Sequence, residues 1–165
     1  MIEQKSLAKS ILLNLFAIVL VIMNLTNVNI AGFNDIMPAF DVMAIFYFTI
    51  YKNIFGLFFV FLLGIWNDSL NGNSLGVTAL LYIILIKFFQ ILNNRILNKD
   101  NFIKIWQQFI YFLILYFFGK WFFLIIINGG SSSFSVLFVQ IIISSLFYIP
   151  MHKLFDYLST KLLGE

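Results

Sequence analysis

Six apolar runs separated by short polar gaps make up most of this sequence. They are residues 7–25, 38–51, 54–66, 75–92, 105–127 and 134–155. A helix needs about 20 apolar residues to cross the hydrocarbon layer of a membrane, which is about 30 Å thick. The fifth run meets that length, and the second and third are clearly shorter. The pattern predicts an all-α integral membrane protein, a compact bundle of six transmembrane helices in a single domain, residues 1–165.

The basic residues fall in alternate gaps between the runs. Eight of the ten Lys and Arg residues lie before or at the start of the first run, in the second and fourth gaps, or at and beyond the end of the last run; they are Lys5, Lys9, Lys52, Arg95, Lys99, Lys104, Lys153 and Lys161. None lies in the gaps 26–37, 67–74 or 128–133. Because Lys and Arg in short loops mark the cytoplasmic side of a membrane protein, this asymmetry predicts that both termini are cytoplasmic.

The second and third runs are separated only by Lys52 and Asn53. Two arrangements fit this spacing: a tight hairpin of two short helices, or one long helix broken at Asn53. Merging the runs would place Arg95, Lys99 and Lys104 on the outer side, so the charge pattern favours the hairpin. Short helices in a bundle require either local thinning of the bilayer or burial among longer neighbours.

The composition excludes several classes of protein. Hydrophobic residues make up 62% of the chain and charged residues only 10%, whereas soluble domains carry about 25% charged residues. The net charge of +3 comes from basic residues along the predicted cytoplasmic edges of the helices. There they set the topology and contact anionic head groups rather than nucleic acid. The chain has no cysteine, so disulfides and thiolate metal sites are excluded.

Asp41, Asp68, Lys87 and Lys120 are the charged residues whose expected depth in the membrane is informative. The predicted topology places Asp41, Asp68 and Lys120 at one depth in the outer leaflet, with Lys87 near the inner end of the fourth helix. Because charges in a membrane are costly, each is usually retained for a partner or a pathway. We expect Lys87 to extend its amine to the head groups. Asp68 is the expected partner of Lys120, with Asp41 near enough to compete.

Catalytic and metal-binding constellations are not evident. The one histidine, His152, lies beside Lys153 at the end of the last run and is expected to be an interfacial side chain. Asp41 and Asp68 resemble a carboxylate pair, but the sequence suggests no polar cavity residues around them. We therefore expect no catalytic residue, no metal site and no cofactor.

The stretch from Pro38 to Leu80 resembles the rod shape-determining protein MreD family. That family has a proline opening the second span, a glycine beginning the third, a G-x-x-x-D motif closing it, and a G-x-x-A-L motif opening the next. The matching residues here are Pro38, Gly56, Gly64, Asp68, Gly76, Ala79 and Leu80. The Lys52-Asn53 pair and the acid at Asp41 depart from the family pattern.

Physical arguments give several motif positions a role. Pro38 suits the first turn of a helix, where its missing N–H is not needed. Gly56 and Gly64 are two turns apart, so they share a helix face and are expected to let another helix approach closely. The glycines at 72 and 76 have the spacing of a helix-packing motif, but Asn71 and its polar neighbours indicate a turn.

The resemblance implies a multi-pass protein of the bacterial inner (plasma) membrane that acts as a non-catalytic scaffold of cell-wall elongation. It would maintain cell shape by binding an MreC-like membrane protein. Through that protein it would link MreB filaments to the peptidoglycan glycosyltransferase and transpeptidase. On this basis, Pro38, Asp41, Gly56, Gly64, Asp68, Gly76 and Lys120 are candidate partner-binding or structural residues.

Two other functions compete with a scaffold. A six-helix substrate-binding membrane subunit of a vitamin-type importer has a similar size and should line an outward-facing pocket with polar or aromatic side chains. Trp66, Asn67, Asn71 and Asn73 are the candidates for such a pocket. An intramembrane enzyme acting on lipid-linked wall precursors would need clustered basic residues on the outer face or a second buried acid with a base, and the sequence offers neither.

Overall fold

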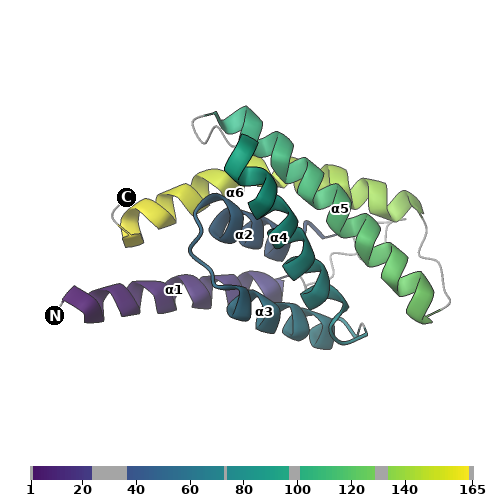
Figure 1. Ribbon diagram of the computed structural model, residues 1–165, viewed down its shortest axis with the longest axis horizontal. Coiled ribbons are helices and arrows are strands. Elements are labelled where there is room, and N and C mark those ends of the chain that lie inside the picture. Colours follow the sequence, from purple (N-terminus) through teal and green to yellow (C-terminus); the bar gives the residue numbers. More distant parts are fainter. Residues whose placement is uncertain (1, 24–36, 73, 97–100, 129–133, 164–165) are drawn as a thin grey trace.

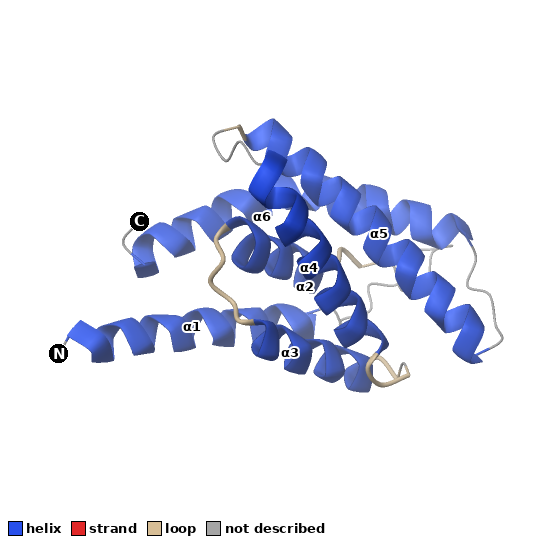
Figure 2. Ribbon diagram, viewed as in Figure 1, coloured by secondary structure: helices blue, strands red, loops and turns tan. Residues whose placement is uncertain are grey.

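The computed structural model describes residues 2–23, 37–72, 74–96, 101–128 and 134–163, and all regular structure in these ranges is helical. Figures 1 and 2 show the six helices that the sequence predicts. They are α1 (Ile2–Met23), α2 (Phe40–Ile45), which continues into the π-helical η1 (Phe46–Tyr51), α3 (Leu57–Leu70), α4 (Val77–Ile96), α5 (Phe102–Asn128) and α6 (Phe134–Leu163). The expected loops in 26–37 and 128–133 lie largely outside the described residues, and of 93–104 only 97–100 do, because α4 continues to Ile96 and α5 begins at Phe102.

The short helix formed by α2 and η1 is the centre of the bundle. Every residue from Asp41 to Ile50 is buried. The α2 part packs against α1 and α6, and η1 packs against α4 and α5. A helix that is apolar on all sides is stable only when neighbours cover every face. Burial among longer helices therefore explains how so short a helix fits in the bundle (Figure 1).

The second and third helices form a hairpin, and the alternative of one long broken helix is wrong. The chain turns between Tyr51 and Leu57, where Asn53 has a φ of 55°. The amide Nδ2 of Asn67, near the end of α3, donates to Oδ2 of Asp41, at the start of α2, at 2.5 Å. The expected place of Pro38 needs a small correction: α2 begins at Phe40 with Ala39 as its N-cap, so Pro38 precedes the first turn.

Helices α3 and α4 touch through their backbones at one point. A methyl group added to Gly64 would lie 2.7 Å from the backbone nitrogen of Ala79, so only glycine permits this separation. This confirms the expected close approach at Gly64. The same expectation is wrong for Gly56, which is exposed, serves as the N-cap of α3 and has no neighbour within 4 Å of an added methyl group.

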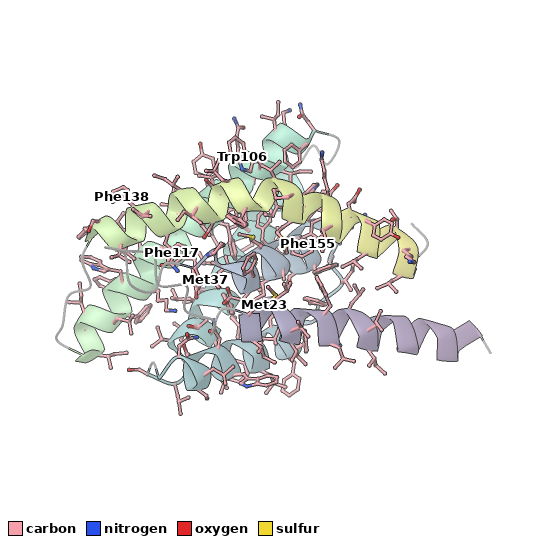
Figure 3. All side chains as sticks on the ribbon, turned by 180° about the vertical axis from the view of Figure 1, so that it is seen from behind. Met23, Met37, Trp106, Phe117, Phe138 and Phe155 are labelled. Atoms are coloured by element: carbon pink, nitrogen blue, oxygen red, sulfur yellow. The ribbon has the colours of Figure 1, made fainter. Side chains whose placement is uncertain are left out.

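The outer surface of the bundle is largely apolar. Two helical segments, Phe102–Ile127 and Phe134–Leu162, are long and apolar enough to cross a membrane, and the other apolar helices are shorter. Figure 3 shows Phe155 directed between α6 and α1 and Phe138 on the outside of α6, and their exposed fractions are 0% and 54%. The start of α1 and the end of α6 lie at the same end of the molecule (Figure 1).

Replacing Gly64 with alanine is predicted to destabilise the α3–α4 contact. The added methyl group would overlap the backbone of Ala79, and such overpacking costs about 1–3 kcal/mol. The thermal unfolding midpoint of the purified protein in detergent measures the effect. Gly56→Ala is the matched control, because a methyl group there meets nothing. Equal midpoints for Gly64→Ala and Gly56→Ala would contradict the close contact.

Candidate functional site

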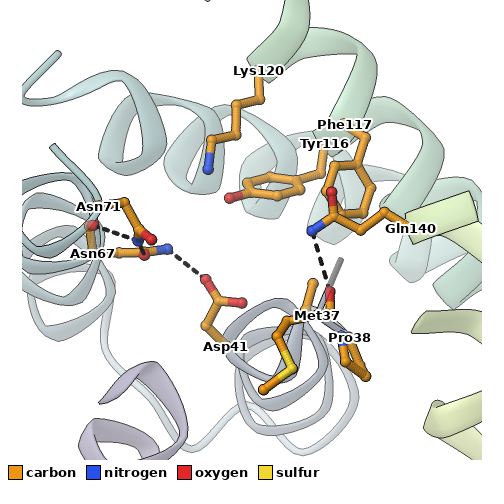
Figure 4. Close-up of a pocket in the computed structure, with 10 residues that line it drawn as sticks. Met37, Pro38, Asp41, Asn67, Asn71, Tyr116, Phe117, Lys120 and Gln140 are labelled. Atoms are coloured by element: carbon orange, nitrogen blue, oxygen red, sulfur yellow. Dashed lines mark hydrogen bonds between the residues drawn. The ribbon is translucent and has the colours of Figure 1, made fainter. Parts of the chain in front are cut away.

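Asp41 and Lys120, two of the predicted site residues, line one cavity of about 260 Å³. The cavity lies between the start of α2, the end of α3, and the facing sides of α5 and α6 (Figure 4). Its polar lining consists of Asp41, Asn67, Asn71, Tyr116, Lys120 and Gln140. We call this the polar cavity. The expectation that no polar residues surround Asp41 is therefore wrong. Helices distant in the sequence supply them.

The carboxylate of Asp41 is held from two sides. Its Oδ2 accepts a hydrogen bond of 2.5 Å from Nδ2 of Asn67 and another of 2.5 Å from the hydroxyl of Tyr82. The residue is only 3% exposed. A buried carboxylate is costly unless it accepts such bonds, and bonds to an ionised acceptor are about twice as strong as neutral ones. The start of α2 is therefore fixed to both α3 and α4.

Asn67 and Tyr82, the two donors to Asp41, are themselves held by further contacts. Asn71 donates through Nδ2 to the backbone oxygen of Asn67 at 2.8 Å and also to the side-chain oxygen of Asn67. The ring of Tyr82 stacks on the ring of Tyr116, with centroids 5.4 Å apart and planes inclined by 16°. These contacts hold the Asn67 amide and the Tyr82 hydroxyl toward the carboxylate.

Helix α6 closes the cavity on the side opposite α3. Nε2 of Gln140 donates to the backbone oxygen of Met37 at 3.2 Å, and the backbone N–H of Ala39 donates to Oγ of Ser144 at 3.0 Å. Both bonds hold the segment that leads into α2. Because Gln140 uses its nitrogen for this bond, its side-chain oxygen is left as an acceptor on the cavity wall.

Lys120 enters the cavity from α5 and is partly buried. Its amine lies 5.9 Å from the centre of the Tyr116 ring, and Figure 4 shows it on the side of the cavity opposite Asp41. Within the described residues, no carboxylate oxygen lies within the 4.0 Å of a direct ion pair with this amine.

Asp68 does not form the expected pair with Lys120. Its Oδ2 accepts hydrogen bonds from the backbone N–H groups of Gly76 at 2.9 Å and Thr78 at 3.0 Å. The first N–H groups of a helix have no partner inside the helix, and a carboxylate that accepts from them caps it. Asp68 is therefore a cap of α4 supplied by α3. The expected pair with Lys120 is therefore wrong, because the carboxylate of Asp68 is directed to the start of α4.

The turn between α3 and α4 depends on two glycines. Gly72 has a φ of 63° and Gly76 a φ of 94°, conformations that strain other residues. This confirms the interpretation of these glycines as turn residues rather than a helix-packing motif. At Gly76 the conformation also presents the backbone N–H to Asp68.

A second, partly buried polar cluster that the sequence analysis does not predict lies near the end of α6. The hydroxyl of Tyr47 donates to Oδ1 of Asp156 at 2.9 Å and lies 3.3 Å from Oγ of Ser159. His152, expected to be an interfacial side chain, is 9% exposed. It is surrounded by the rings of Tyr47, Tyr51, Phe102 and Tyr148.

The candidate sites contain no recognisable metal centre in the described part of the chain, where no group of three or more His, Asp or Glu residues could hold an ion. Of the residues that line the cavity, the sequence analysis identifies Pro38, Asp41 and Lys120 as candidates, and it names Asn67 and Asn71 only for an importer. It missed Tyr116 and Gln140, as it missed Tyr82 behind the wall. For an isolated tyrosine or glutamine in an apolar run, the sequence does not show which residue it contacts.

The fold is an α-helical bundle with a largely apolar exterior, two helical segments in its described part that are long and apolar enough to cross a membrane, and a polar cavity inside. The model of the family described as rod shape-determining protein MreD matches residues 4–158 of the chain. The chain therefore belongs to the MreD family, a membrane protein family that functions in shape determination, as the resemblance implied. Comparison with curated proteins finds no match, and neither does comparison with solved structures.

Additive effects are predicted for Asp68→Ala and Lys120→Met. Loss of the cap at Asp68 should cost about 1–2 kcal/mol, and Asp68→Asn should cost less because it keeps an acceptor oxygen. Since Asp68 bonds to Gly76 and Thr78 and not to Lys120, the double variant should equal the sum of the singles within about 0.5 kcal/mol. Chemical unfolding in micelles measures the three variants. A coupling above about 1 kcal/mol would show that the two side chains pair after all.

Proposed function

We propose that this protein is a non-catalytic scaffold of the bacterial cell-wall elongation machinery, spanning the inner membrane several times and binding an MreC-like membrane protein. The observation that carries the proposal is the family match over residues 4–158. Through that partner the scaffold would link MreB filaments to the peptidoglycan glycosyltransferase and transpeptidase. Both termini would face the cytoplasm, as the distribution of basic residues predicts.

A buried core and an apolar exterior suit a protein that acts by contact. The central helix is buried on every side, so the bundle presents one packed arrangement rather than a deformable one. Large apolar side chains cover its outside, including Phe58 at 75% exposed and Ile91 at 70% exposed. An apolar surface of this kind is solvated by lipid or covered by another membrane helix.

An apolar groove on this surface is the contact face that we assign to the membrane helix of the MreC-like partner. It has a volume of about 540 Å³ and lies between α3, α4 and α5. Its lining includes Phe61, Leu75, Leu80, Ile84, Phe123 and Ile127. Leu80 and Ile84 are one turn apart on α4 and are 45% and 52% exposed, so they form a ridge against which a second helix can pack.

The importer alternative predicted an outward-facing polar pocket, and Asn67 and Asn71 do line the polar cavity. Trp66, another candidate, is 39% exposed and does not line it. Asn73 lies outside the described residues. The family match covers nearly the whole chain and favours the scaffold. The cavity is compatible with a ligand in either case.

Depletion of the protein is predicted to turn rod-like or curved cells into spheres, and the wild-type chain should restore their shape. Leu80→Trp and Ile84→Trp, which would fill the groove, should restore shape poorly and should lose the MreC-like partner during purification from native membranes. Ile142→Trp is the matched control, because Ile142 is 57% exposed on α6 and lies outside the groove.

Two results would contradict parts of this proposal. Unchanged cell shape together with loss of uptake of a defined nutrient would contradict the scaffold and support the importer. Normal shape and full partner retention in Leu80→Trp and Ile84→Trp would leave the scaffold in place but would show that the groove is not its contact face.

A further inference from the structure

The two charges of the polar cavity face each other without touching. Asp41 receives both of its hydrogen bonds on Oδ2, and within the described residues its Oδ1 accepts none. Lys120 lies across the cavity beside Tyr116, farther than the 4.0 Å of a direct ion pair from any described carboxylate (Figure 4). Charges in a site shielded from bulk water are costly unless each meets an opposite charge. Among the described residues, the cavity therefore presents one charge of each sign that lacks a direct ion-pair partner.

The cavity has room for a small molecule between these charges. Its volume of about 260 Å³ is well above what a single water molecule needs. The ammonium of Lys120 lies on one side of the cavity and the carboxylate of Asp41 on the opposite side, while Gln140 adds a side-chain oxygen on the α6 wall (Figure 4). A molecule with an anionic group at one end and an N–H-bearing cation at the other would satisfy both charges.

We propose that the polar cavity binds a small zwitterion that carries a primary ammonium and a phosphate or carboxylate group. The anionic group is placed against Lys120, and the ammonium donates to Asp41 and Gln140. Within a membrane, the head group of phosphatidylethanolamine has this chemistry. In solution, phosphoethanolamine and free amino acids have it. A trimethylammonium group has no N–H to donate to Asp41, so a phosphatidylcholine head group should bind more weakly.

This site is independent of the scaffold proposal. The partner's contact face lies on the apolar groove of α3, α4 and α5, whereas the zwitterion is enclosed by Asp41, Lys120 and Gln140. Its test measures ligand binding to the purified protein, so failure of either proposal leaves the other standing.

Lipid retention on the purified protein tests the proposal. The protein in detergent is exposed to equal amounts of phosphatidylethanolamine, phosphatidylglycerol and phosphatidylcholine with the same acyl chains, and retained lipid is counted by native mass spectrometry. We expect phosphatidylethanolamine to be retained about tenfold over the other two, the size of effect that one charge-assisted hydrogen bond gives. Lys120→Met and Asp41→Asn should each bring the three lipids to equal retention. Lys87→Met, which changes an exposed lysine on α4, should leave the preference unchanged.

Titrations with soluble zwitterions identify the source of the ligand. Phosphoethanolamine and glycine are titrated while the thermal unfolding midpoint is followed. Saturable stabilisation by either, lost in Lys120→Met, supports the zwitterion site. If it occurs without a preference for phosphatidylethanolamine, the source is a soluble zwitterion. Should Asp41→Asn fail to fold, Lys120→Gln and Lys120→Met carry the test, because they leave the hydrogen bonds of Asp41 in place.

Three outcomes would overturn the proposal. One is equal retention of the three lipids together with no saturable effect of either soluble zwitterion. Another is a preference for phosphatidylethanolamine that survives both Lys120→Met and Asp41→Asn. The third is occupation of the cavity by a segment of a co-purified protein, detected by cross-linking to Gln140→Cys, with neither lipid nor zwitterion able to displace it.

Discussion

The structure depends on burying a short helix that carries a charge. Asp41 opens the central helix and lies in its buried stretch, where a carboxylate without donors would cost several kcal/mol. Asn67 from the end of α3 and Tyr82 from α4 supply those donors. This requirement fixes the hairpin of α2 and α3 and the rotation of α4. It also leaves the second carboxylate oxygen on the cavity wall, so the interaction that stabilises the core also shapes the candidate site.

Packing between α3 and α4 explains the second half of the family motif. Gly64 and Ala79 let α3 and α4 meet at their backbones, and one turn along α3 Asp68 caps the start of α4 through Gly76 and Thr78. The glycine and the acid of G-x-x-x-D therefore work with the glycine and the alanine of G-x-x-A as one structural unit. Pro38, at the start of the motif, lines the cavity, and the two charged residues of the cavity, Asp41 and Lys120, do not belong to the motif.

The sequence predicted the helices well because each apolar run is a local property of the chain. It predicted Gly64 correctly and Gly56 wrongly, since spacing places two residues on one face but does not show which of them meets a neighbour. The expected pair of Asp68 and Lys120 rested on depth in the membrane alone. Depth does not determine the direction around the bundle, and Asp68 is directed to the start of its own neighbour α4. Tyr82, Tyr116 and Gln140 could not be predicted, because their roles come from tertiary contacts between distant runs.

The central claim is that this bundle crosses the inner membrane with both termini inside and the turn between α3 and α4 outside. Labelling of single cysteines in intact cells tests it without background, since the chain has no native cysteine. Three exposed positions suit the test: Ser69 near the end of α3, Asn101 before α5 and Thr160 near the end of α6. A membrane-impermeant reagent should label Ser69→Cys in intact cells, and Asn101→Cys and Thr160→Cys only after permeabilisation. Labelling of Asn101→Cys in intact cells, with Ser69→Cys protected, would contradict the account.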